Sequence, residues 1–292
     1  ADRVVVLNFG SASGSPVVVN GEAVRNISIA AQSATQITVV YQQTNNNNVK
    51  GYVIDISGNT PIPGPVATIN TAALAAQEGT GLVAMTATKL LCVYHIAGTT
   101  LRERVLDLTG NTISGISAEV IAESTSGGFA FDYVGKITST KALAATLGSS
   151  SQTVLRLQSL TGSTPAPTGT VLSLASPSST DVKSAFAVVI MSSLRAVIVK
   201  PVDRGAGALA IYIVDISGTS PVLIVSKLAS VDLGVPANAH VYAAKMDSNR
   251  IYASWLGSSS QGVDSLVIAI TSDDRIMTGP INERQGGDSV TA

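Results

Sequence analysis

Short apolar runs, each bounded by polar turn residues, recur along the whole chain. Between residues 35 and 87 the runs are rich in Val, Ile, Tyr and Thr, and they occupy 37–42, 50–57, 64–70 and 81–87. Because side chains alternate along a strand, the second run places Tyr52 and Ile54 on one face and Val53 on the other. No run carries a capped apolar stripe with a 3.6-residue period. The pattern predicts strands joined by turns, with at most a turn or two of helix at 71–79.

The runs belong to a repeat. The sequence VIDISGNTP at 53–61 returns as VLDLTGNTI at 105–113, LQSLTGSTP at 157–165 and IVDISGTSP at 213–221. The shared glycines, at steps of 52, 52 and 56 residues, are Gly58, Gly110, Gly162 and Gly218. The strands that open the units begin at residues 35, 88, 140 and 193, and a weaker copy spans 248–255. Self-similarity at a fixed period indicates an architecture in which neighbouring units bury each other's faces.

Units of four antiparallel strands in about 50 residues resemble the blades of β-propellers. The opening "T-K" before an apolar strand and the later "D-[apolar]-[ST]-G" turn are similar to degenerate propeller repeats of phage virion and tail-fibre proteins. The resemblance implies an all-β fold, a β-propeller of four-stranded antiparallel blades. It also implies a single domain, 1–292, divided into a partial unit 1–34, full units 35–87, 88–139, 140–192 and 193–247, and a partial unit 248–292.

The blade count stays open at this point. The two partial units each supply three strands, and propellers often close by completing one blade from both termini, which removes exposed edges. If 248–255 completes a blade with the N-terminal strands, five blades result and two strands are left over. The alternatives are six blades, two of them three-stranded, or a fragment of a longer propeller.

Composition and charge limit the classes of partner that the chain can bind. Charged residues are 13% of the chain, about half the share of roughly 25% that is usual in soluble domains. The net charge of −1 provides no basic field for nucleic acid. The most apolar stretch, 184–202, is broken by Ser192 and Arg195, so we expect two buried strands and no membrane insertion. The single cysteine, Cys92, lies in an apolar run and is expected to be buried.

The repeated aspartates have two interpretations. Asp55, Asp107 and Asp215 occupy one repeat position, where they could form a ring of carboxylates or could each bond the amides of their own turn. The third copy has Ser159 there and the last has Ala269, which favours the structural role. The four repeat glycines are expected to adopt a positive φ in tight turns.

No catalytic or metal-binding motif stands out. The two histidines, His95 and His240, lie far apart in the sequence without neighbouring ligands, and both are expected at surface or rim positions. There is no nucleophile elbow, phosphate loop or calcium loop. We therefore expect no catalytic residues, no metal and no cofactor. The expected core residues are Tyr41, Ile54, Ile56, Val93, Tyr94, Val197, Ile198 and Ile213.

The main functional hypothesis is a non-catalytic virion or extracellular protein that contacts other virion proteins or copies of itself. A host surface receptor or glycan is a further possible partner. The alternatives are a carbohydrate-binding or carbohydrate-active propeller, for which Trp255 is the sole tryptophan available, and a bacterial surface adhesin. The candidate contact residues lie in polar or inserted loops: Asn45, Asn46, Asn47, Asn48, Asp203, Arg204 and Asp232.

Overall fold

The described part of the chain is built of strands and turns. The computed structural model describes residues 23–71, 79–96, 100–124, 133–148, 152–174, 186–202, 208–229, 241–256, 263–279 and 282–284. No helix occurs among these residues, so none of them forms a helix long and apolar enough to cross a membrane. The chain divides into two compact units, one of residues 1–146 and 158–167 and the other of residues 147–157 and 168–292.

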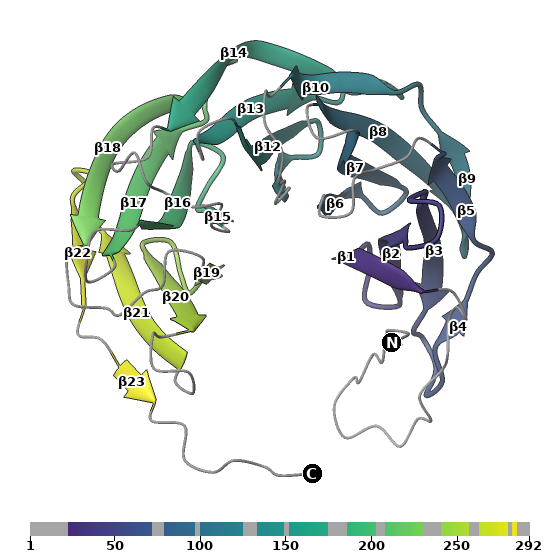
Figure 1. Cartoon of the computed structure of the whole chain (residues 1–292), viewed down its shortest axis with the longest axis horizontal. Coiled ribbons are helices and arrows are strands. Elements are labelled where there is room, and N and C mark those ends of the chain that lie inside the picture. Colours follow the sequence, from purple (N-terminus) through teal and green to yellow (C-terminus); the bar gives the residue numbers. More distant parts are fainter. Residues whose placement is uncertain are drawn as a thin grey trace. The chain divides into compact units, whose positions relative to one another are not determined.

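The first unit contains two complete antiparallel sheets (Figure 1). In the first sheet, β3 pairs with β2 on one side and with β4 and β5 on the other; its strands are β1 (Val24–Ala31), β2 (Gln36–Gln43), β3 (Val49–Asp55), β4 (Ile62–Pro63) and β5 (Ala67–Asn70). The second sheet has the same plan; its strands are β6 (Thr80–Thr86), β7 (Lys89–Ile96), β8 (Thr100–Thr109), β9 (Thr112–Ile116) and β10 (Val120–Ser124). In both sheets the last strand position is split into two short strands.

The chain contains three more sheets, and the last two lie within the second unit. The third sheet consists of β11 (Tyr133–Thr138), β12 (Lys141–Leu147), β13 (Thr153–Ser159) and β14 (Ala166–Leu174). The fourth consists of β15 (Ala187–Ile190), β16 (Arg195–Val202), β17 (Ala208–Asp215) and β18 (Val222–Ala229). The fifth consists of β19 (Val241–Lys245), β20 (Arg250–Leu256), β21 (Val263–Ile270), β22 (Ile276–Thr278) and β23 (Asn282–Arg284).

The sheets are offset by one strand from the sequence repeats. Strand β6 closes the repeat 35–87 in sequence, yet it pairs with β7 of the following repeat. The short β6–β7 hairpin makes this pairing local, and sequential strands usually pair. Strand β20 pairs with β19 on one side and β21 on the other. The closure in which 248–255 completes a blade with N-terminal strands is therefore wrong.

Strand β7, in the middle of the second sheet, is buried on both faces. In the first unit, Cys92 and Tyr94 of β7 pack in one cluster with Val53 of the first sheet. The alternate residue Val93 packs in another cluster with Ala142 of the third sheet. In the second unit, one face of β16 and one face of β20 share a core, which includes Val197, Val199, Ile251, Ala253 and Trp255. The other face of β20 is more open, since Tyr252 is 41% exposed. Antiparallel sheets stacked face to face in this manner are β-propeller blades, as the sequence predicts.

The core prediction is confirmed. Seven of the eight expected residues are at most 2% exposed: Tyr41, Ile54, Val93, Tyr94, Val197, Ile198 and Ile213. The eighth, Ile56, is half-buried and packs against the first-sheet cluster. Cys92 is buried, as expected.

One turn design recurs in all five sheets. A Ser, Thr or Asp side chain at the end of the first strand accepts a bond from the amide two residues later, in the pairs Ser33–Thr35, Thr86–Thr88, Thr138–Thr140, Ser192–Leu194 and Asp247–Asn249. The carbonyl of the second residue of each pair then accepts a 2.8 Å bond from the end of the third strand. Local side-chain bonds of this kind fix a turn, and they explain why the unit-opening marker is the most regular part of the repeat.

Candidate functional site

The repeated aspartates belong to their own turns and sheets. Asp55 Oδ1 accepts a 2.8 Å bond from the Ser57 amide, and Asp215 Oδ1 accepts the same bond from Ser217. The bonds from Ser57 hold the pKa of Asp55 below its ordinary value. Asp107 instead forms an ion pair with Lys89, with 3.0 Å between Oδ1 and Nζ.

The glycine prediction holds for two positions and is wrong for the other two. Gly110 has φ +55° and Gly162 has φ +121°, whereas Gly58 and Gly218 do not have a positive φ. The sign of φ at each glycine depends on what the aspartate of the same repeat bonds. Where Asp55 or Asp215 bonds its own turn, the chain bends without a left-handed residue. Where the aspartate pairs with Lys89 or is replaced by Ser159, glycine supplies the positive φ.

The asparagine loop lies against β1. Asn45 and Asn46 are exposed, and Asn46 Oδ1 accepts a 3.2 Å bond from the Asn48 amide. Asn47 has φ +60°, and its side-chain oxygen accepts a bond from Arg25 Nη2. Two of the four asparagines are therefore used to shape the loop and to fasten it.

Three candidate contact residues and one histidine lie outside the described residues: Asp203, Arg204, Asp232 and His240. The expectation for His95 is wrong, because this side chain is only 2% exposed, with Nε2 at 3.5 Å from Thr146 Oγ1. In the part of the chain that the structure describes, no three His, Cys, Asp or Glu residues are grouped as metal ligands would be.

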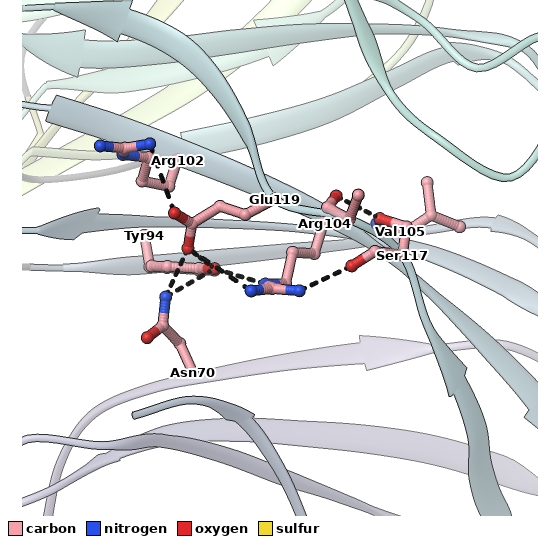
Figure 2. Close-up of polar contacts among 8 residues, drawn as sticks. Asn70, Tyr94, Arg102, Arg104, Val105, Ser117 and Glu119 are labelled. Atoms are coloured by element: carbon pink, nitrogen blue, oxygen red, sulfur yellow. Dashed lines mark hydrogen bonds and ion pairs between the residues drawn. The ribbon is translucent and has the colours of Figure 1, made fainter. Parts of the chain in front are cut away.

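A polar network that the sequence did not reveal connects the first two sheets. Figure 2 shows Asn70, Tyr94 and Arg104 converging on Glu119. Asn70 ends β5 of the first sheet, Tyr94 lies near the end of β7, and Arg104 lies on β8. Glu119 precedes β10, in the gap that splits the last strand position of the second sheet. This gap allows a side chain from the sheet edge to reach the inner strands.

The Tyr94 hydroxyl is the centre of the network. It donates to Glu119 Oε2 at 2.7 Å and accepts from Asn70 Nδ2 at 3.0 Å and Arg104 Nε at 2.9 Å. A phenol offers one donor and two acceptor sites, so its bonding capacity is filled. Burial raises the pKa of Tyr94 well above its ordinary value, so the hydroxyl remains a donor to the carboxylate at any physiological pH.

The guanidinium of Arg104 has three polar partners. Besides Tyr94, its Nη1 donates to the Ser117 carbonyl at 2.6 Å, and its Nη2 lies 3.7 Å from Glu119 Oε2. The bond to the Ser117 carbonyl anchors the segment that carries Glu119. The same segment is held by Ser117 Oγ, which accepts a 2.9 Å bond from the Val105 amide. The carboxylate of Glu119 is thus fixed both through its own bonds and through its backbone.

Glu119 and Arg102 form the accessible edge of this network. Glu119 Oε2 is occupied by Asn70 and Tyr94, while Oε1 has one long ion pair, 3.3 Å to Arg102 Nη1. The side chains of Glu119 and Arg102 are 22% and 26% exposed, whereas Tyr94 is fully buried. At this one point of the surface, the fixed carboxylate of Glu119 offers a hydrogen-bond acceptor. The guanidinium of Arg102 beside it offers hydrogen-bond donors. The arrangement suits a ligand with adjacent hydroxyl groups.

The sequence carried a faint signal for this network. In a chain with 13% charged residues, Arg102 and Arg104 alternate inside one apolar strand, which places both on the face that bears Tyr94. The partners could not be found in the same way, because Asn70 and Glu119 are 49 residues apart and meet only through sheet stacking.

The sole tryptophan is not an exposed platform. Trp255 is 1% exposed in the core between β16 and β20 of the second unit, and its Nε1 has no hydrogen-bond partner. Stacking on an accessible indole, which the sequence left open, is therefore excluded for the fold as described.

No protein-family model and no curated protein sequence matches the chain. Solved structures do match. The SapL1 lectin, in complex with alpha methyl fucoside, aligns with a TM-score of 0.55 and 15% identity over 90% of this chain and 81% of the lectin. A six-bladed β-propeller fucose-recognising lectin from Aleuria aurantia aligns with a TM-score of 0.52 and 12% identity over 90% and 80%. A protein from Lactobacillus plantarum aligns with a TM-score of 0.60 and 14% identity over 89% and 71%.

At these identities the similarity concerns the fold. The lectin from Aleuria aurantia has a six-bladed β-propeller fold, and the sheets of this chain align with it. Together with the sheet order and the burial of β7 on both faces, the alignments establish a β-propeller fold for this chain.

Proposed function

We propose that this chain is a non-catalytic carbohydrate-binding propeller, and that the Glu119–Arg102 edge is a saccharide-binding site. The observation that carries the proposal is the fixed carboxylate: Glu119 Oε2 is bound by Tyr94 and Asn70, while the side chain stays 22% exposed. The similarity in fold to fucose-binding lectins supports the same class of ligand.

The chemistry of recognition follows from the free bonding capacity. Glu119 Oε1 accepts a hydrogen bond from one sugar hydroxyl, and Arg102 donates to a neighbouring hydroxyl oxygen. Bonds in which one partner is charged are about twice as strong as neutral ones. Tyr94, Asn70 and Arg104 position the carboxylate, which lowers the ordering cost on binding.

The main hypothesis from the sequence, a virion or attachment protein, has less support. The solved structures that are similar in fold include fucose-binding lectins, and these favour the carbohydrate-binding alternative. A glycan ligand is compatible with a host-attachment role, an extracellular location and a surface adhesin, so these remain proposals about context. We also propose that the inserted loops contribute to contact with a partner. Their candidate contact residues are Asp203, Arg204 and Asp232.

The test is a glycan-binding assay on the full chain. We expect wild-type protein to bind one or more saccharides on an array that includes methyl α-fucoside, and Glu119→Gln and Arg102→Ala to lose most of that binding. The control is Lys89→Ala, which removes a half-exposed cation from the opposite end of β7. Circular dichroism verifies the fold of each variant.

Two results would overturn the proposal. One is the absence of binding to any saccharide at millimolar concentration. The other is binding that Glu119→Gln and Arg102→Ala leave unchanged, which would place the site elsewhere in the chain.

A further inference from the structure

Arg25 of β1 lacks the carboxylate partner that five other arginines have. In those five, a guanidinium nitrogen lies 2.6 to 3.7 Å from a carboxylate oxygen; they are Arg102, Arg104, Arg195, Arg250 and Arg275. Among the residues that the structure describes, the polar partners of Arg25 are amide oxygens. Its Nε donates to Gln42 Oε1 at 3.0 Å, and its Nη2 donates to Asn47 Oδ1. Arg25 is partly buried, and its charge is not neutralised by these contacts.

A β-bulge in β1 helps to hold the side chain of Arg25. The register of β1 on β2 shifts between Arg25 and Ser28, and Asn26 has φ +51°. Consecutive side chains of a regular strand point to opposite faces, but here Asn26 Nδ2 also donates to Gln42 Oε1, at 2.7 Å. The Asn26 carbonyl accepts a 2.6 Å bond from Thr80 Oγ1 of β6. Bulges re-aim side chains in this way and are common next to functional sites.

The guanidinium of Arg25 retains donors for a ligand. It has five N–H donors in a planar fork. The bonds to Gln42 and Asn47 use two of them, which leaves three on Nη1 and Nη2. The two amide oxygens fix the orientation of the group without supplying a negative charge. Since Arg favours bidentate bonding to a carboxylate, the arrangement suits a ligand that carries one.

Arg25 lies in one row of the first sheet with Asn70, which holds Glu119 of the saccharide-binding site. The row consists of successive strand partners in β1, β2, β3 and β5, namely Arg25, Gln42, Val49 and Asn70. Three strand spacings, about 14 Å, separate its ends. The loop 44–48 joins β2 to β3 at this end of the sheet, so its exposed residues Asn45 and Asn46 lie between Arg25 and Asn70.

We propose that this end of the first sheet extends the saccharide-binding site, and that the ligand is an acidic oligosaccharide whose carboxylate binds Arg25. The inference rests on the proposed function, in which Glu119 and Arg102 bind the hydroxyl groups of one sugar. The span of the row is longer than one sugar ring, so the carboxylate belongs to another sugar of the same chain. The exposed amides of Asn45 and Asn46 can bond the hydroxyl groups between them.

Calorimetric titration of the full chain compares acidic saccharides with their carboxyl methyl esters, which keep the rings and hydroxyl groups but lose the charge. The probes are trigalacturonic acid and sialyllactose. We expect at least one acid to bind about tenfold or more tightly than its ester, with a difference that added salt reduces. Arg25→Gln removes this difference. Gln42→Glu also removes it, because it keeps the shape of the side chain and supplies Arg25 with an internal carboxylate.

The matched control is Arg275→Gln, which removes the same charge from a side chain that is 80% exposed and leaves the preference for the acid intact. Circular dichroism verifies the fold of each variant. The inference is overturned if neither acid binds, if the acids bind no more tightly than their esters, or if Arg25→Gln retains the preference.

The neutral esters test the proposed function separately, because their binding depends on Glu119 and not on Arg25. Ester binding that Glu119→Gln abolishes, without any preference for the acid, would support the proposed function and overturn the role of Arg25. A preference for the acid that Arg25→Gln removes, while Glu119→Gln binds like wild type, would support the Arg25 site and refute the site at Glu119.

Discussion

Replacing Tyr94 with Phe separates the role of one hydroxyl group from that of the buried ring. The substitution leaves the aromatic packing of Tyr94 in the cluster between the first two sheets. It removes three hydrogen bonds, two of which join charged groups, Glu119 and Arg104. Bonds to charged groups contribute about 1.5–3 kcal/mol each, and neutral ones about 0.5–1.5 kcal/mol.

The expected loss is smaller than the sum of these bonds. Glu119 keeps its bond from Asn70, and Arg104 keeps the Ser117 carbonyl. Because Glu119 and Arg104 are each 22% exposed, water can replace part of what is lost. We therefore expect Tyr94→Phe to lower the free energy of unfolding by about 2–4 kcal/mol, and to weaken saccharide binding because Glu119 is less firmly held.

Urea unfolding followed by circular dichroism measures the first effect. The matched control is Tyr52→Phe, since Tyr52 is 2% exposed but its hydroxyl has no hydrogen-bond partner among the described residues. We expect the control to change stability by less than about 1 kcal/mol. Equal losses in the two variants, or a loss below about 0.5 kcal/mol for Tyr94→Phe, would refute the assignment of the hydroxyl as the centre of the network.

Three further predictions concern the fold. Ile54→Ala, at a fully buried position of β3, should cost roughly 2–5 kcal/mol in urea unfolding, and a cost below about 1 kcal/mol would contradict the packing described. Gly110→Ala should destabilise by about 1 kcal/mol because φ is +55°, whereas Gly58→Ala should be neutral or slightly stabilising, and the reverse order would show the turn assignment to be wrong. Burial raises the pKa of Tyr52 and Tyr133 to about 12, so the unfolded chain loses these protons first and stability should fall as the pH rises from about 10 toward 12; a urea midpoint that stays constant over this range would contradict it.

The local pattern of this sequence determined its strands and most of its core. Alternation along each apolar run gives the buried faces, since side-chain direction in a strand depends only on position along the chain. The recurrence of the turn residues gives the repeat, because a Ser, Thr or Asp side chain bonds an amide two residues away. Seven of the eight core residues could be named on this basis alone.

The same local reasoning failed where two turn devices compete. A glycine after a strand predicts a positive φ, and this is correct for Gly110 and Gly162. For Gly58 and Gly218 the aspartate three residues earlier bonds the turn, so the backbone does not need the left-handed region. The sequence contained both signals, but which of them prevails depends on whether the aspartate is drawn away, as Asp107 is by Lys89.

The tertiary structure alone decided which strands share a sheet and which side chains meet. The sequence repeat does not indicate which strand is the first of a sheet. The assignment of β6 to the second sheet therefore depends on its pairing with β7. The candidate site depends on contacts between Asn70, Tyr94 and Glu119, which are 24 to 49 residues apart. Sequence patterns report neighbours along the chain, whereas the stacking of one sheet on the next brings together residues from different repeats, and only this stacking fixes the carboxylate of Glu119.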